Sequence, residues 1–413
     1  NATDVNSFKL TMRDVLTNNI LPYWINNVTD HENGGFYGRI DGYENVHPEA
    51  DKGAVMNARI LWSFAASYRV LKKREYLETA RRAKDYIEAH FLDKEYGGLY
   101  WCVDYKGNPV DTKKQTYAIG FAIYGFSEYA RATGDKEALA MALSLYDDIE
   151  RHAFDAENNG YVEALTREWA PIADMRLSDK DENGSRTMNT HLHIIEPYTN
   201  LYRCMKEMGI SPVEHGTEEE QTMLRVGKSA ENLLDIFINK LLNKQTYHLD
   251  LFFNDKWEGE RNVESYGHDI EASWLLHEAA LVLGDKKMLQ RVEPVVRRVA
   301  FAADEGLRKD GAMIYEHWKD TGRQDLQRQW WVECETVIGH INLYQHFHIE
   351  EALDIAVRCW SFIQKHLIDE QHGEWYWAML EDGTVDHDGD KAGFWKCPYH
   401  NSRMCLELIE RDF

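Results

Sequence analysis

The segment GGFYGRID at residues 34–41 decides the fold, because variants of it recur along the whole chain. Each copy alternates aromatic and aliphatic residues after a glycine or a tyrosine, which predicts a short β-strand beside a turn. The other copies are GGLYWCVD from Gly97, GYVEAL from Gly160, YHLDLFF from Tyr247, GAMIYEHW from Gly311 and GEWYWAML from Gly373.

Successive copies start about 62 residues apart, with one longer interval of about 25 extra residues between the third and the fourth. Two polar stretches in that interval, SDKDENGSRT and SPVEHGTEEE, are interpreted as loop insertions. The chain therefore contains six repeats of one supersecondary unit.

Helical patterns, apolar at i, i+3, i+4 and i+7, lie between the copies, and each copy follows an odd-numbered helix. We predict twelve helices, at 7–28, 52–71, 74–92, 113–133, 136–153, 187–208, 220–241, 265–284, 286–303, 327–347, 350–368 and 397–411.

A helix pair cannot bury its apolar face alone, so the six pairs should share one core. We expect a single all-α domain over 1–413, an (α/α)6 barrel of twelve helices with short β-hairpins in its loops. An open solenoid of helix pairs has the same periodicity, but it gives no reason for polar residues to gather at one phase of every repeat.

The composition excludes several classes of function. A formal charge of −23 without basic clusters argues against nucleic acids and anionic membranes, and no apolar run is long enough to span a bilayer. The 6 cysteines form no CxxC pair, so we expect reduced thiols and a cytoplasmic protein. Asn1 and Ala2 are expected to be a tag remnant or to follow a removed segment.

Candidate functional residues lie near the start of the even-numbered helices, which we take as the inner ring. Equal phases in a six-fold ring converge on one rim, where a pocket is expected. These residues are Arg59 in NARILW, Tyr117, Asn189 and His193 in TMNTHLHIIEPY, His268 and Glu271 in SYGHDIEASWLL, Trp331 and Glu335 in QWWVECETVIGH, and Trp395 and His400 in FWKCPYHNSRMC.

Helical geometry places Asn189, His193 and Glu196 on one face, with His191 pointing elsewhere, and makes His268 and Glu271 neighbours. Both HLHIIE and HDIE contain H-x-x-E, which two paired helices can use to bind two metal ions. The remaining inner helices offer arginine, tyrosine and tryptophan instead of further glutamates, so we favour carboxylates that orient imidazoles or bind hydroxyls.

Thirteen tryptophans, several of them in the last third of the chain, suit the C–H face of a pyranose ring. A sugar pocket in such a barrel also fits a glycosidase, with Asp269, Glu271, Glu335 and Asp181 as candidate carboxyl groups. Histidines near neutrality are better matched to proton abstraction next to a carbonyl group, which favours enolisation.

Five of these motifs together, NARILW, TMNTHLH, SYGHDIEASWLL, QWWVECETVIG and WKCPYHNSRMC, resemble the cellobiose 2-epimerases of the N-acylglucosamine 2-epimerase superfamily over essentially the whole chain. The mannobiose 2-epimerases are a close variant. The resemblance implies the same (α/α)6 barrel and reversible inversion of C2 at the reducing end of cellobiose, lactose or β-1,4-mannobiose through a cis-enediol. It implies no cofactor and no metal.

Carried over by position, His268 and His400 resemble the two acid/base histidines, and His193 a third histidine for ring opening or for stabilising the intermediate. Arg59 and Asn189 match residues that hold the O1 and O2 region. The remaining substrate contacts match Tyr117, Glu271, Trp331 and Trp395.

The chain departs from the family pattern at Ser402, where glycine is frequent, and at Cys334, where a small residue is usual; both bear on pocket shape. N-acylglucosamine 2-epimerase and aldose–ketose isomerase activities stay open, as does a sugar-binding protein without activity. The expected partner is a small disaccharide, with no nucleic acid and no membrane, and the expected assembly is a monomer or a homodimer.

Overall fold

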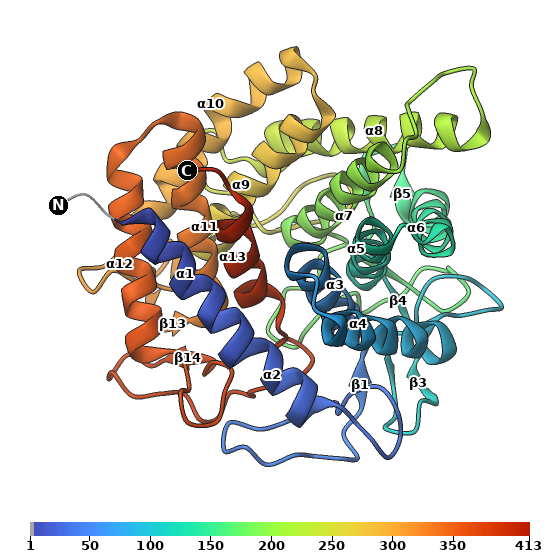
Figure 1. Ribbon diagram of the computed structural model, residues 1–413. Helices are drawn as coiled ribbons and strands as arrows, with labels where there is room; N and C mark the ends of the chain where they lie inside the picture. The colour runs from blue at the N-terminus through green and yellow to red at the C-terminus, as the bar shows by residue number, and fades with distance from the viewer. Residues whose placement is uncertain (1–3) are drawn as a thin grey trace.

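The computed structural model describes residues 4–413, in which twelve main helices form two concentric rings (Figure 1). Asn1 and Ala2 lie outside the described residues. The inner ring consists of α3 (Ala54–Leu71), α5 (Thr116–Thr133), α7 (Met188–Glu207), α9 (Tyr266–Leu283), α11 (Trp330–Phe347) and α13 (Tyr399–Glu410). The outer ring consists of α1 (Val5–Val15) with its continuation α2 (Leu21–Tyr23), α4 (Arg74–Tyr86), α6 (Lys136–Asp148), α8 (Glu218–Ile236), α10 (Lys286–Ala303) and α12 (Glu350–His366).

The inner and outer helices differ in how much of their surface is buried, as their sequence patterns predict. In α3 every residue from Ala54 to Ser67 is buried, whereas α4 buries a stripe that includes Tyr76, Ala80 and Ala83. An outer helix covers the core with one face, but an inner helix is surrounded by protein. Several outer helices end in five-residue π-helical segments, namely Leu16–Ile20, Trp24–Val28, Ile87–Phe91, Ile149–Ala153 and Phe237–Leu241.

The inner ring is closed. Each inner helix contacts the next from α3 to α13, and α13 contacts α3 in turn. α13 also packs against α1, so that the first and last helices lie side by side (Figure 1). The predicted (α/α)6 barrel is confirmed, and the open solenoid is wrong.

The recurring segments form tight hairpins after the outer helices. Their bridges are Thr29 with Phe36, Leu92 with Leu99, Leu242 with Leu249, Leu307 with Met313 and Ile368 with Trp375, and the third hairpin pairs β5 (Phe154–Asp155) with β6 (Gly160–Tyr161).

A second kind of pairing links neighbouring repeats, because the strand before an inner helix pairs with the recurring segment of the next repeat. These pairs are β1 (Lys52–Gly53) with β2 (Cys102–Val103), β4 (Lys114–Gln115) with β7 (Ala164–Leu165), β8 (Arg186–Thr187) with β9 (Phe252–Phe253), β10 (Val263–Ser265) with β11 (Glu316–Trp318), and β13 (Arg328–Gln329) with β14 (Ala378–Met379). β3 (Pro109–Asp111) extends the first sheet and β12 (Gln324–Asp325) the fourth. The bridge between Ile40 and Ala392 completes the circle.

An ion pair stabilises most of these junctions. The cation comes from the strand or loop before the inner helix and the carboxylate from the end of the outer helix or the turn that follows it. The pairs are Lys52–Asp30, Lys114–Asp93, Arg186–Asp155, Arg328–Asp310 and Lys391–Asp369. In the fourth repeat Glu264 takes the cation's position, and His248 lies between it and Asp269.

Two details of the sequence prediction are corrected. The stretch SPVEHGTEEE is not loop throughout, since Thr217 and Glu220 form a capping box that begins α8 at Glu218. Helices expected from 113 and 327 begin at Thr116 and Trp330 because β4 and β13 occupy the preceding residues.

Within residues 4–413 no helix is long and apolar enough to cross a membrane. The 6 cysteines are buried and unpaired in this part of the chain.

Candidate active site

The first two turns of the inner helices carry two layers of side chains at one end of the barrel. The outer layer uses the second or third residue of a helix and consists of Tyr117, Asn189, His268, Trp331 and His400. One turn deeper, the fifth or sixth residues give a second layer of Arg59, Phe121, His193, Glu271, Glu335 and Arg403. Residues three or four positions apart lie on the same face of a helix, so each outer-layer side chain stands directly above a deeper one on its own helix.

A cavity of about 490 Å³ opens at this end and is lined by His268 and Asn189 together with loop residues of the third to fifth repeats. Its volume falls within the range of small-molecule sites. Burial raises the pKa of Glu163 to about 8 and that of Glu316 to about 7, and both carboxyl groups line the cavity. Near neutrality each can donate as well as accept a hydrogen bond.

His400 is held by Glu335. Its Nδ1 lies 2.9 Å from Oε2 of Glu335. The other oxygen, Oε1, accepts hydrogen bonds from Nε1 of Trp274 and from Arg403. Burial raises the pKa of Glu335, and Arg403 acts in the opposite direction by favouring the ionised carboxylate. While it is ionised, the carboxylate only accepts, so Nδ1 carries the proton in the neutral imidazole and Nε2 is left free to act as a base. Burial, with Arg59 and Arg403, keeps the pKa of His400 well below its usual value, so the free enzyme holds it neutral.

His193 has a similar arrangement on α7. Its Nδ1 lies 3.1 Å from Oε1 of Glu196, and its ring contacts those of Tyr117 and Phe121. Burial lowers the pKa of His193 against the opposing effect of Glu196. Although burial alone would raise the pKa of Glu196, Arg403 and His193 lower it to about 2, so this carboxylate is an acceptor at neutral pH.

His268 is held by a hydroxyl group and not by a carboxylate. Its Nδ1 lies 2.7 Å from the hydroxyl of Ser265, and not against Glu271. Burial lowers the pKa of His268 to about 3. A hydroxyl can donate or accept, so the Ser265 contact allows either tautomer of His268. His268 and Glu271 are therefore neighbours on α9 without a hydrogen bond between them, and Ser265 orients the imidazole.

His191 points away from the site, as expected: its Nδ1 bonds to the carbonyl of Thr187 and its Nε2 accepts the N–H of Tyr161.

Arg59 brings a cation to the second layer. Its guanidinium donates to the hydroxyl of Tyr117 at 2.8 Å and lies over the rings of Phe121 and Tyr399, 4.4 and 4.7 Å from their centroids. The aromatic rings exclude water and the guanidinium stays charged, which makes it a strong partner for an anion.

Arg403, which the sequence analysis did not select, is fully buried at the centre of the deeper layer. It donates to Glu271 at 2.7 Å, to Glu335 at 3.0 Å and to Glu196. Burial and the nearby Glu335 raise the pKa of Glu271 well above its usual value. Its one signal in the sequence is the i, i+3 spacing from His400.

The geometry also bears on the metal-site alternative. Glu271, Glu335 and His400 bring ligand atoms within 4.8 Å of one another, but the guanidinium of Arg403 bonds to both carboxylates and already provides their cation. The H-x-x-E pattern at His268 does not form a chelating pair. The second layer therefore fits an arginine-centred network better than a dimetal centre.

The glycosidase alternative needs two carboxyl groups facing each other across the cavity. Glu271 and Glu335 are both bound to Arg403 beneath it, and Asp269 points outward to His248 and the N–H of Leu249. Asp181 lines the cavity alone among the four candidates. No pair of these four flanks the cavity.

Aromatic rings connect the predicted residues. Trp331 contacts both His268 and His400, with ring centroids 4.7 and 5.5 Å apart. Trp395 packs against Tyr117 and Trp101. Ring contacts, hydrogen bonds and ion pairs thus connect eight of the nine predicted residues, and the ninth, Asn189, lines the cavity together with His268. The departing residues Ser402 and Cys334 are fully buried.

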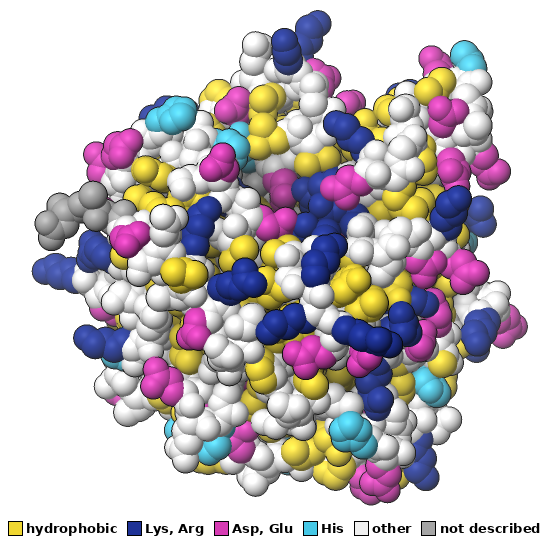
Figure 2. All heavy atoms as spheres, viewed as in Figure 1, with side chains coloured by type: hydrophobic (Ala, Val, Ile, Leu, Met, Phe, Trp, Pro, Cys, Tyr) yellow, Lys and Arg dark blue, Asp and Glu magenta, His cyan; other side chains and the backbone are white. Residues whose placement is uncertain are grey.

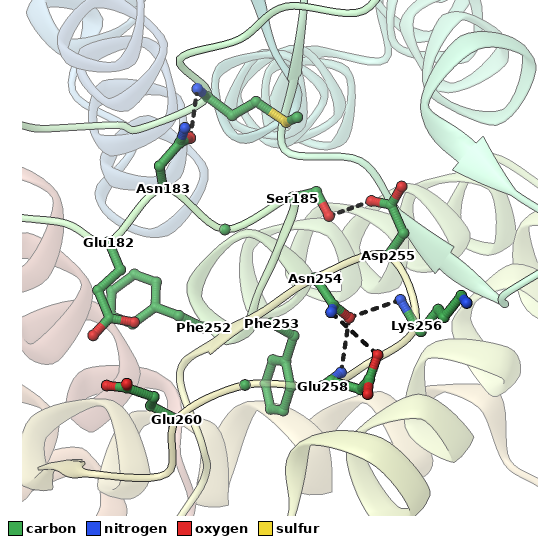
Figure 3. Close-up of a pocket in the computed structure, with 13 residues that line it drawn as sticks. Glu182, Asn183, Ser185, Phe252, Phe253, Asn254, Asp255, Lys256, Glu258 and Glu260 are labelled. Atoms are coloured by element: carbon green, nitrogen blue, oxygen red, sulfur yellow. Dashed lines mark hydrogen bonds between the residues drawn. The ribbon is translucent and has the colours of Figure 1, made fainter.

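A surface groove of about 620 Å³ continues outward from this cavity and shares Glu182 and Phe252 with it. Figure 3 shows two loops facing each other across the groove, joined by the hydrogen bond from Ser185 to Asp255. Carboxylates, amides and phenylalanine rings line it, without a histidine.

The opposite end of the barrel is closed by charges of both signs. Figure 2 shows Lys or Arg and Asp or Glu side chains gathered around a hollow on this face. A smaller cavity of about 190 Å³ lies among the last turns of the inner helices, where Arg203 binds Glu278 and Arg131 binds Glu128. The charges there are largely paired in ion pairs, so this end of the barrel is closed.

Comparisons with known proteins agree with this architecture. The family model described as N-acylglucosamine 2-epimerase (GlcNAc 2-epimerase) matches residues 35–402. The cellobiose 2-epimerase of Bacteroides fragilis is 56% identical over 97% of this chain and 98% of its own length, and that of Ruminococcus albus is 39% identical over the same shares. A solved structure of cellobiose 2-epimerase from Bacillus thermoamylovorans B4167 superposes with a TM-score of 0.89 at 41% identity, over 98% of this chain and 100% of that one.

Proposed function

The chain belongs to the N-acylglucosamine 2-epimerase family and is a carbohydrate epimerase, and from this we propose that it inverts C2 of the reducing-end glucose of cellobiose. Lactose and β-1,4-mannobiose are proposed as further substrates. Two relatives that are 56% and 39% identical over 97% of this chain are cellobiose 2-epimerases, which supports a disaccharide over a monosaccharide substrate.

The observation that carries the mechanism is the placement of His268 and His400 against the same indole, that of Trp331. They come from α9 and α13, on either side of α11 in the ring. Inversion at carbon needs a proton acceptor on one face and a donor on the other. Burial keeps both imidazoles neutral in the free enzyme, so either can accept the first proton.

The reaction follows from these positions. Once the sugar ring has opened, one neutral imidazole takes the proton from C2 and the electron pair moves onto the O1 carbonyl, giving the cis-enediol as its O1 anion. The other imidazole takes up a proton from solvent and donates it to the opposite face of C2, while O1 becomes a carbonyl again and the first imidazole releases its proton to solvent. The two histidines exchange roles in the reverse direction.

Negative charge develops on O1 during the first step. Arg59 is placed to bind it, and the N-termini of the inner helices, which all point to this end of the barrel, add favourable dipoles. His193 is assigned to ring opening or to the intermediate, because its Nδ1 is held by Glu196 and its Nε2 is 3.8 Å from Oε1 of Glu271.

Two buried acceptors remain for substrate hydroxyls. Oδ1 of Asn189 and Oε1 of Glu271 have no hydrogen-bond partner within residues 4–413. A buried polar atom without a partner costs free energy, which a hydroxyl of the sugar would recover. Tyr117, Trp331 and Trp395 supply flat apolar surface for the C–H face of the pyranose ring.

The test is incubation of EDTA-treated protein with cellobiose or β-1,4-mannobiose in deuterated water, followed by proton NMR. The proposal expects the C2 epimer with deuterium at C2, without a dissociable cofactor. Released monosaccharide would indicate a glycosidase instead. A ketose product would indicate an aldose–ketose isomerase. Turnover of N-acetylglucosamine in place of the disaccharides would indicate an N-acylglucosamine 2-epimerase.

A further inference from the structure

One arginine joins three inner helices beneath the candidate active site. Arg403 on α13 donates hydrogen bonds to Glu196 on α7, Glu271 on α9 and Glu335 on α11. Its guanidinium lies against the rings of Trp274 and Tyr399, 4.8 and 4.3 Å from their centroids, which fixes its plane. The side chain is fully buried and does not line the substrate cavity.

Two of the three carboxylates hold a histidine with a second contact. Glu335 lies 2.9 Å from Nδ1 of His400, and Glu196 lies 3.1 Å from Nδ1 of His193. Arg403 is therefore linked to His193 through Glu196 and to His400 through Glu335.

A carboxylate dictates the tautomer of its histidine only while it is ionised, because the ionised group accepts and never donates. Three carboxylates buried together would repel one another and take up protons in the absence of a cation. A neutral carboxyl could rotate its O–H toward Nδ1, which would move the ring proton to Nε2 and remove the free base.

We infer that Arg403 is a positioning residue of the reaction: by binding Glu196 and Glu335 at once, it keeps the proton on Nδ1 of His193 and His400 and leaves each Nε2 free. This assignment rests on the proposed function for its kinetic consequence. The tautomers themselves are a property of the unliganded protein. An arginine is required because a planar guanidinium can serve three carboxylates, whereas an ammonium is a point charge with a different geometry.

The primary test compares Arg403→Lys with a matched control, Arg203→Lys. Arg203 is also a largely buried inner-ring arginine paired with a glutamate, Glu278, but it contacts none of the three carboxylates. We expect kcat for cellobiose epimerisation to fall about 100-fold in Arg403→Lys, because Nε2 of His400 would carry a proton in part of the molecules and could not accept one from C2. KM should change by less than about threefold. Arg203→Lys should retain the wild-type kcat.

The readout that separates positioning from mere stability is the tautomer of His400. In protein labelled with 15N-histidine, long-range 15N–1H spectra should show Nδ1 protonated and Nε2 unprotonated in the wild type and in Arg203→Lys. Arg403→Lys should give a mixture of the two tautomers. A drop in kcat with unchanged tautomers would overturn the inference, as would an unchanged kcat.

Glu335→Gln provides a second route if Arg403→Lys does not fold. The replacement amide can point its NH2 group at Nδ1, so the tautomer of His400 should again change. An Nε2-protonated His400 in the wild type, or a Glu335→Gln variant with the wild-type tautomer, would overturn the inference. If the wild type fails to exchange deuterium into C2, the proposed function fails, while the tautomer result still decides the positioning role.

Discussion

Nδ1 of His400 lies 2.9 Å from a carboxylate oxygen of Glu335, whereas Nδ1 of His268 meets only the hydroxyl of Ser265, at 2.7 Å. The two proposed acid/base groups therefore differ in kind. A carboxylate partner stabilises the imidazolium that forms when His400 takes a proton, while a hydroxyl partner stabilises that of His268 less. The asymmetry should appear when either histidine is removed.

His400→Gln and His268→Gln should each lower epimerisation by at least about 1000-fold, since one face of C2 then lacks its proton donor or acceptor. The remaining histidine should still exchange the C2 proton of one epimer with solvent. We therefore expect deuterium exchange with only one of cellobiose and glucosyl-mannose in His400→Gln, and with only the other in His268→Gln, measured by NMR in deuterated water. Exchange of both epimers by either variant would show that a single base serves both faces.

Ser265→Ala should lower kcat by up to about tenfold, the equivalent of one lost hydrogen bond, because His268 loses the group that orients it. Ser273 on α9, the helix that carries His268, is the control, since its hydroxyl bonds only to the carbonyl of Ile270. Ser273→Ala should leave the rate unchanged. Equal rates for the two variants would mean that Ser265 does not orient the imidazole.

Arg59→Lys should reduce kcat/KM by about 100- to 1000-fold if the guanidinium binds the developing charge on O1. The ammonium of lysine retains the charge but loses the planar contact with Phe121 and the directed bond to Tyr117. Steady-state kinetics should place most of the loss in kcat. A change confined to KM would assign Arg59 to ground-state binding instead.

Much of the fold could be predicted from the sequence, because one short motif recurs at a fixed interval and the helix pairs between its copies have strong apolar periodicity. The order of helices and the inner ring follow from this pattern. The pairing of each strand with the next repeat does not, because a two-residue strand such as Lys52–Gly53 has no pattern of its own. Neither does the bridge from Ile40 to Ala392, whose partners are far apart in the chain.

The candidate site, too, could be predicted from the sequence only in part. Phase within each helix placed His193, Glu271 and His400 at the same end of the barrel, since i, i+4 geometry is a property of any helix. Which groups bond is decided by side-chain rotamers and by the residue before the helix: His268 turns to Ser265 and not to Glu271. Arg403 was missed because a buried charge is recognised only when its partners on three other helices are known.

Lys391→Met should lower the free energy of unfolding by about 3–5 kcal/mol, because it leaves Glu44 and Asp369 without their shared buried cation at the junction that closes the ring. The control is Lys365→Met on the exposed face of α12, which should change stability by less than about 0.5 kcal/mol. Urea unfolding followed by circular dichroism measures both. Equal midpoints for the two variants would show that the ion pair does not stabilise the closure.

His191 should make the protein less stable as the pH falls from about 6.5 toward 4. Burial lowers the pKa of its imidazole to about 4, and its Nε2 accepts the N–H of Tyr161 only while neutral. Since the folded-state pKa lies below the unfolded value of about 6.5, the unfolded chain binds the proton first, so stability present above pH 6.5 is lost below it. In His191→Gln this contribution to the slope of unfolding free energy against pH should disappear, although the variant is less stable at pH 7. The comparison is urea unfolding of both proteins at several pH values between 4.5 and 7.5, and parallel slopes would exclude His191 as the responsible group.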